Sequence, residues 1–171
     1  MKKLTYLIPA LAVIVLVISC CETGKKDVAA APQTQPAVEF RDYGPEPFVM
    51  DIEQFTLQND LYRTTVWTGS YLQMTLMSIN PGEDIGLEMH PDIDQFLRIE
   101  AGTGMVVMGP AKDSLDFQSP VEDDFAIFIP AGKWHNVINN GNEPLKIYSI
   151  YSPPEHPFGT VHKTYQEGME N

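Results

Sequence analysis

Short runs of apolar and β-branched residues recur along the chain between about residues 60 and 152, separated by turn signals rich in glycine, proline and asparagine. They include YRTTVWTG, YLQMTLMSI, QFLRIEAG and FAIFIPAG. Runs of this length with period-two alternation are typical of strands, and a long helical period is absent from the sequence. The pattern therefore predicts an all-β sandwich or barrel, with one short helix near residues 51 to 58.

The first 20 residues have a different pattern. Lys2 and Lys3 precede an apolar run from Leu7 to Ile18, which contains Pro9. The run has the length of a secretory signal and is too short to span a hydrocarbon layer of about 30 Å. It ends in Val-Ile-Ser-Cys, which resembles a bacterial lipobox, so we expect cleavage after residue 19 and a lipid anchor on Cys20. The protein would then be tethered to a membrane of the bacterial cell envelope. The alternative is an ordinary signal peptide with an incidental cysteine.

The rest of the chain divides by composition. Residues 20 to 47 mix Ala, Pro, Gln and charge without apolar periodicity, which predicts a flexible spacer after the lipidated cysteine. Residues 48 to 165 are expected to form one domain, and residues 166 to 171 a tail. The two cysteines are adjacent, at Cys20 and Cys21, so no disulfide is expected inside the domain.

The negative charge of the chain argues against nucleic acid as a partner. The full sequence carries a formal net charge of −12, and loss of residues 1 to 19 removes two lysines and no acids, which leaves −14. Binding to nucleic acid depends chiefly on basic groups at phosphates, so nucleic acid is not an expected partner.

Candidate chemistry lies in the stretch PGEDIGLEMHPDIDQFLRIEAGTG, residues 81 to 104. If residues 86 to 90 form a strand, Glu88 and His90 face the same side. A turn at residues 91 and 92 followed by a second strand would bring Gln95 beside His90. His135, just after a Pro-Ala-Gly turn, would converge on the same interior. Asp92 and Asp94 are rival ligands that turn chemistry explains better.

The spacing of these residues resembles the first motif of the cupins, a superfamily of double-stranded β-helix or jelly-roll barrels. In that motif a Gly is followed by five residues, His-x-His, three or four residues, Glu, six residues and Gly. Gly82, His90 and Gly102 stand in register, whereas Glu88 fills the first histidine position and Gln95 the glutamate position.

The second cupin motif matches more closely. Pro130, Gly132, His135 and Asn139 are all in place, and the leading glycine is replaced by Asp124. The resemblance covers residues 70 to 152 and implies an all-β jelly-roll barrel.

The resemblance also implies a metal site formed by Glu88, His90, Gln95 and His135. An amide oxygen in place of one imidazole shifts the preference toward Mn, Fe(II) or Zn rather than Cu. A similar inventory of two His, one Glu and one Gln occurs in the zinc site of type I mannose-6-phosphate isomerases, in a different order. The alternative is a cupin without metal, in which the four side chains form a hydrogen-bonded network in a wet pocket.

The segment SPPEHPFGTVHKT holds His156 and His162. They are candidates for acid-base catalysis if the segment forms a rim at the barrel mouth. A tail packed on the outer sheet, with both histidines exposed, is the favoured expectation.

Two functions follow from the sequence. The first is a metal-dependent isomerase or dioxygenase-type enzyme acting on a small polar, sugar-like or oxygenated molecule. The second is a lipoprotein that binds a small ligand or sugar without catalysis. A symmetric homodimer is expected in either case.

Overall fold

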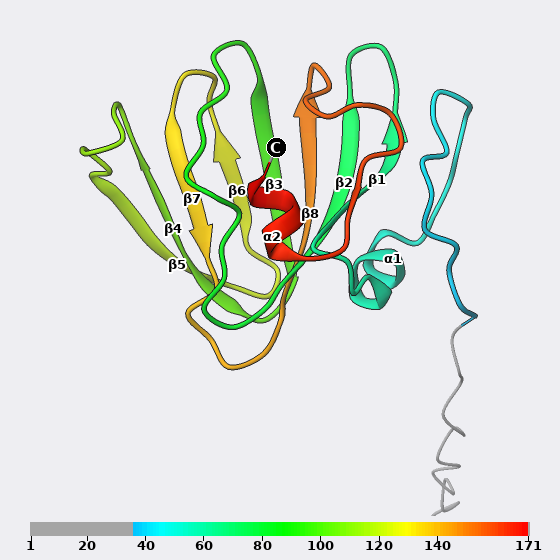
Figure 1. Ribbon diagram of the computed structural model, residues 1–171, viewed down its shortest axis with the longest axis horizontal. Helices are drawn as coiled ribbons and strands as arrows, with labels where there is room; N and C mark the ends of the chain where they lie inside the picture. The colour runs from blue at the N-terminus through cyan, green and yellow to red at the C-terminus, as the bar shows by residue number, and fades with distance from the viewer. Residues whose placement is uncertain (1–35, 171) are drawn as a thin grey trace, which may run out of the picture. The chain divides into compact units, whose positions relative to one another are not determined.

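The computed structural model describes residues 36 to 170, so the expected signal sequence and Cys20 lie outside the described residues. The described chain contains two short helices and nine strands (Figure 1). Their bounds are α1 Ile52–Gln58, β1 Arg63–Thr68, β2 Gln73–Ile79, β3 Asp94–Ala101, β4 Thr103–Gly109, β5 Phe117–Glu122, β6 Ala126–Ile129, β7 Trp134–Ile138, β8 Leu145–Ser152, β9 Val161–His162 and α2 Tyr165–Met169.

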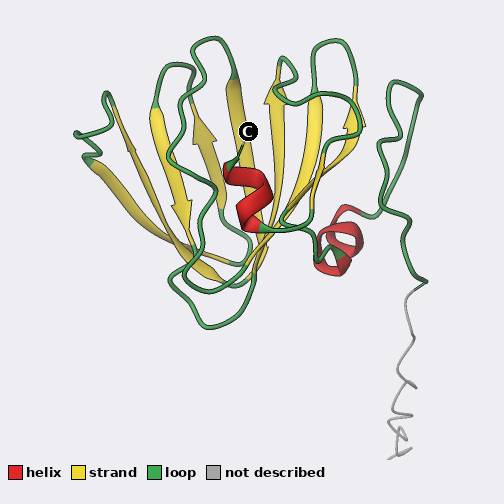
Figure 2. Cartoon of the chain, in the orientation of Figure 1, coloured by secondary structure: helices red, strands yellow, loops and turns green. Residues whose placement is uncertain are grey.

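The strands form two antiparallel sheets that face each other (Figures 1 and 2). The larger sheet has the order β6-β3-β8-β2-β1-β9, and the smaller one has the order β5-β4-β7. The predicted all-β jelly roll is confirmed. The predicted helix at residues 51 to 58 is present as α1, and the carboxylate of Asp51 caps its N-terminus by accepting a hydrogen bond of 3.0 Å from the Gln54 N–H.

Side chains from both sheets fill the space between them. Leu97, Ile99 and Ile147 of the larger sheet meet Val106 and Val137 of the smaller one, and all are buried. Burial of each such side chain contributes about 1.5 to 3 kcal/mol, so this core is the main source of stability.

On three neighbouring strands of the larger sheet, β3, β8 and β2, the inward-facing side chains change from apolar to polar toward one end of the barrel. On β8, Leu145 and Ile147 are followed on the same face by Ser149 and Tyr151, all of them buried. The two neighbouring strands repeat the change at the same level, because Gln95 and Gln73 are both paired with Tyr151. The barrel therefore has an apolar floor and a polar end.

Residues 36 to 47 do not form the flexible spacer that their composition predicts. Val38, Phe40 and Tyr43 pack against the outer apolar cluster of the larger sheet. The Trp67 indole N–H also donates a hydrogen bond of 2.9 Å to the Glu46 carbonyl. The compact unit begins at Pro36, and apolar side chains without any regular period are sufficient to hold this segment on the sheet.

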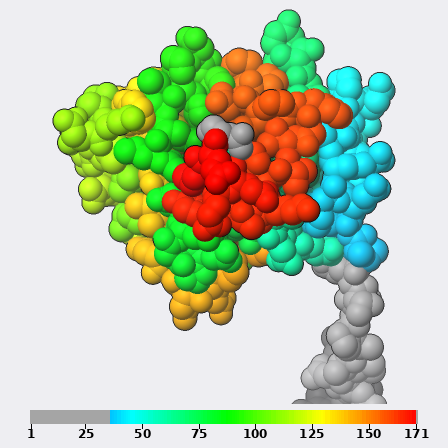
Figure 3. All heavy atoms as spheres, viewed as in Figure 1, coloured from blue at the N-terminus to red at the C-terminus, as the bar shows by residue number. Residues whose placement is uncertain are grey.

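The expected tail is also part of the fold. The last described residues form α2, which Thr164 caps. Gly168 lies so close to the Tyr62 ring that a Cβ there would come within 2.1 Å of it. The C-terminal residues cover the middle of the face shown in Figure 3. In the described part of the chain, the helices are too short and too polar to cross a bilayer.

Candidate metal centre

Backbone pairing places Glu88 opposite His135. Residues 86 to 90 do not form the predicted strand, and this part of the loop instead makes an isolated antiparallel bridge to β7. The Glu88 N–H donates to the His135 carbonyl at 3.0 Å, and the His135 N–H donates back to Glu88 at 2.9 Å. The two side chains therefore leave the backbone side by side.

His90 is held beside this pair by the Pro-Ala-Gly turn. Gly132 has φ +78°, a left-handed conformation that glycine adopts without strain. Its N–H donates a hydrogen bond of 2.7 Å to the His90 carbonyl, and the His90 and His135 ring centroids lie 5.5 Å apart. The turn that leads into His135 is thus hydrogen-bonded to the backbone of His90.

Glu88, His90 and His135 present three donor atoms to one point. Oε1 of Glu88 lies 3.4 Å from Nε2 of His90 and 3.4 Å from Nε2 of His135. The three residues form a group whose ligand atoms all lie within 4.8 Å of one another. His135 is fully buried and His90 nearly so, while Glu88 is partly exposed.

Gln95 lies on the polar end of β3, opposite Tyr151 of β8. It is buried, and its Nε2 donates a hydrogen bond of 3.0 Å to Ser149 Oγ. Tyr151, its partner on β8, has its ring 5.9 Å from that of His90. The amide is thus fixed by its nitrogen, and its oxygen remains available.

The four predicted ligands share one property. A buried polar atom normally has a hydrogen-bond partner, yet each of these side chains has one buried atom without any. These atoms are Glu88 Oε1, His90 Nε2, Gln95 Oε1 and His135 Nε2. Such a set fits a bound cation, which the lone pairs of all four atoms would coordinate.

The opposite nitrogens of the two imidazoles are held in place. Nδ1 of His135 lies 2.8 Å from the Lys133 carbonyl, which can only accept, so Nδ1 carries a proton. Nε2 faces Glu88, toward which it donates when it also carries a proton, and it offers a lone pair when a cation is bound. Nδ1 of His90 lies 3.3 Å from a carboxylate oxygen of Glu155. Contacts of this kind orient histidine ligands in metal proteins.

The electrostatics keep Glu88 charged. Burial alone would raise the pKa of Glu88, but the imidazoles of His135 and His90, with Arg63, outweigh it and lower the pKa to about 2. Burial acts to lower the pKa of His90, but Glu88 and Glu155 more than offset it, so the pKa of His90 is raised. Binding of a cation at Nε2 of His90 therefore competes with a proton.

The two rival aspartates lie outside the group. Asp94 is exposed, and its carboxylate accepts a hydrogen bond of 2.9 Å from the Ala131 N–H. Asp92 is also exposed. Neither aspartate belongs to the group formed by Glu88, His90 and His135.

The C-terminal segment forms a rim at the barrel mouth, so the favoured expectation of an outer tail is wrong. Buried Gln73 clamps it: the amide donates a hydrogen bond of 2.7 Å to the His156 carbonyl and accepts one of 2.8 Å from the His156 N–H. A cavity of about 400 Å³ lies under this rim, lined by Glu88, Glu155, His156 and His162.

Arg63 lines the same cavity and was not predicted from the sequence. It is 5% exposed and lies on the inward face of β1, where its partner on β2 is the core residue Met77. The only available signal is the alternation in YRTTV, which places Arg63 and Thr65 on one face.

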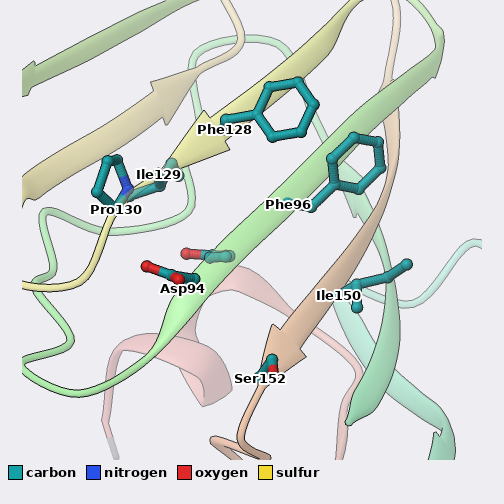
Figure 4. Close-up of a pocket in the computed structure, with 8 residues that line it drawn as sticks. Asp94, Phe96, Phe128, Ile129, Pro130, Ile150 and Ser152 are labelled. Carbon is teal, nitrogen blue, oxygen red and sulfur yellow. The ribbon is translucent and has the colours of Figure 1, made fainter.

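A second hollow, of about 410 Å³, lies elsewhere on the larger sheet (Figure 4). Its lining includes Phe96, Phe128 and Ile150, which Figure 4 shows on β3, β6 and β8. Phe96 and Ile150 alternate away from the inward-facing Gln95 and Tyr151, and they pack with the outer cluster. This hollow opens on the outside of the barrel, and Gln95 is the one candidate ligand that also lines it.

Comparison with known proteins supports the jelly-roll fold. The family model described as "Cupin domain" matches residues 75–151, and the chain belongs to the cupin superfamily.

The chain is 64% identical over 130 residues to the uncharacterized protein YrkC of Bacillus subtilis (strain 168), a match that covers 76% of this chain and 70% of YrkC. It is 43% identical over 115 residues to the uncharacterized protein L612 of Acanthamoeba polyphaga mimivirus, with 67% and 70% covered. The crystal structure of BH2720 from Bacillus halodurans shares 60% sequence identity and superposes with a TM-score of 0.76, over 77% of this chain and 99% of BH2720.

Proposed function

We propose that this protein binds a divalent metal ion through Glu88, His90, Gln95 and His135 and acts on a small oxygenated molecule at the barrel mouth. The observation that carries the proposal is the set of four buried donor atoms without hydrogen-bond partners. Two imidazoles, one carboxylate and one amide oxygen suit Mn, Fe(II) or Zn.

The chemistry that fits is of isomerase or dioxygenase type. A divalent ion in such a site supplies Lewis acidity toward a carbonyl, hydroxyl or enediol oxygen, or reactivity with O₂. The chain supplies the cavity beside Glu88 and a hydrogen-bond acceptor at its wall. Burial, with Arg63, lowers the pKa of His156 to about 3, so its imidazole is neutral at pH 7. Its Nε2 is buried without a partner and is placed to accept a hydrogen bond from a bound hydroxyl.

We place this activity at the bacterial cell envelope, with the chain anchored by a lipid on Cys20. The support is the apolar run that ends in Val-Ile-Ser-Cys. Cys20→Ser should move the protein from the membrane fraction to the soluble fraction of cells, as measured by immunoblot. If the variant stays with the membranes, the anchor is wrong.

Elemental analysis of the full chain, purified in detergent without chelators, tests the metal centre. We expect about one divalent ion per chain. His135→Ala should lose the ion, because it removes one of the imidazole ligands and so weakens metal binding. His162→Ala is the matched control and should keep the ion. If the parent protein retains none, and binds none tighter than millimolar, the non-catalytic ligand-binding lipoprotein replaces the enzyme.

A further inference from the structure

Arg63 is a buried cation for which residues 36 to 170 supply no counter-ion. Its Nε is buried and has no hydrogen-bond partner, and within residues 36 to 170 no carboxylate forms an ion pair with its guanidinium. The guanidinium makes a cation–π contact with the Tyr62 ring, whose centroid lies 5.5 Å from Cζ. The other two arginines of the chain each have a carboxylate partner, Glu39 for Arg41 and Glu100 for Arg98. A buried charge is costly to leave unpaired, so an unpaired one calls for a ligand.

The place of Arg63 identifies where that ligand lies. Arg63 lines the cavity of about 400 Å³ together with Glu88 and His156. The backbone of β1 fixes it there, because Arg63 pairs with Met77 on one side and His162 on the other.

The charges around the cavity favour an anion. Arg63 and a divalent ion would bring three positive charges, whereas Glu88 and Glu155 bring two negative ones, and His156 is neutral. One positive charge is left for the ligand to balance. A guanidinium presents parallel N–H donors that match the two oxygens of a carboxylate. Arg63 is the only Arg or Lys among the described residues that line the cavity, which suits a carboxylate better than a more highly charged phosphate.

We infer that the barrel mouth binds a small organic acid, whose carboxylate pairs with Arg63 and whose neighbouring oxygen faces Glu88 and His90. The inference rests on the proposed function for the second contact and for the two ion charges in the charge balance, whereas the unpaired guanidinium of Arg63 is independent of it. The unpartnered Nε2 of His156 offers a further hydrogen bond on the same ligand. The substrate class of the proposed enzyme would then be a small hydroxy or keto acid.

Glycolate is the test probe, because it carries a carboxylate and an adjacent hydroxyl. It is titrated into the full chain in detergent, both metal-free and loaded with Zn²⁺, while the Arg63 Nε–H signal is followed by ¹⁵N NMR and affinity is measured by calorimetry. We expect a saturable shift of that signal. Arg63→Gln should weaken glycolate binding about 10-fold to 100-fold, the loss typical of a hydrogen-bonded charge pair. Arg98→Gln, which removes an arginine from the outer face, should change the affinity less than about 2-fold.

Two further readouts separate an anion-binding role of Arg63 from a purely structural one. Arg63→Gln should leave the metal content unchanged and should not lower the melting temperature of the unliganded protein. A purely structural role of Arg63 predicts a lower melting temperature. If metal is absent but glycolate still shifts the Arg63 signal, the metal centre fails and the anion site stands. If metal is present and Arg63→Gln binds glycolate as tightly as the parent, the anion site is wrong. Tighter binding of inorganic phosphate than of glycolate would overturn the assignment to a carboxylate.

Discussion

Replacing Glu88 by glutamine should flatten the acid dependence of stability in the metal-free protein. In the folded state the two imidazoles and Arg63 outweigh burial and hold the pKa of Glu88 at about 2, against an ordinary value of 4.5. A lowered pKa means that the folded state stabilises the carboxylate. This stability is fully present above about pH 4.5 and is lost as the pH falls through about 2. One unit of pKa shift is worth about 1.4 kcal/mol, so the difference between the unfolded and folded pKa of Glu88 corresponds to about 3 kcal/mol of stability.

The assay is urea unfolding of metal-free protein at a series of pH values from 7 down to 2. The parent should lose about 3 kcal/mol more than Glu88→Gln between pH 5 and pH 2. Glu122→Gln, at an exposed position of β5, is the control and should follow the parent. Equal acid dependence in the parent and Glu88→Gln would refute the close packing of this carboxylate against the imidazoles.

Two other substitutions test how the site is framed. Gln73→Leu removes both hydrogen bonds that clamp His156, so unfolding free energy should fall by at least about 1 kcal/mol and proteolytic cleavage near residues 153 to 160 should rise, whereas the exposed Gln118→Leu should do neither. Equal cleavage of the two variants would show that the clamp does not hold the rim. Asp124 has φ +70° at the position where the second motif has glycine, so Asp124→Val should cost about 1 to 2 kcal/mol in thermal or urea unfolding, and Asp124→Gly should keep the parent's stability. A neutral Asp124→Val would contradict this reading of the turn.

The fold and the grouping of Glu88, His90 and His135 follow from local features of the sequence. Alternation on β3 and β8 predicts which side chains enter the barrel, and the glycines of the motifs predict where the chain turns. The loop around Glu88 was not predicted, because pairing with the edge of β7 replaces a regular strand there. Gly86, with φ +91°, interrupts the extended conformation that the prediction assumed.

The remaining features depend on contacts between distant parts of the chain. The clamp on the rim joins Gln73 to His156, which are 83 residues apart, so no local pattern can show it. The alternation along β1 predicts that Arg63 faces inward. Its burial, with no counter-ion among the described residues, depends on the C-terminal segment that pairs with β1 through β9. Residues 36 to 47 lack periodicity because they pack as an irregular segment and not as a strand or helix.

The central claim is that Glu88, His90, Gln95 and His135 hold a divalent ion, and calorimetry of metal binding across matched charge variants tests it most directly. At fixed pH, Glu88→Gln should weaken Mn²⁺ or Zn²⁺ binding markedly, because it removes the one carboxylate of the set. Gln95→Glu should tighten binding, because it adds a second carboxylate where the unpartnered amide oxygen now lies. In a hydrogen-bonded pocket without metal, the same change would bring two carboxylates together and raise the pKa of one of them. Weaker metal binding by Gln95→Glu than by the parent would contradict the metal centre.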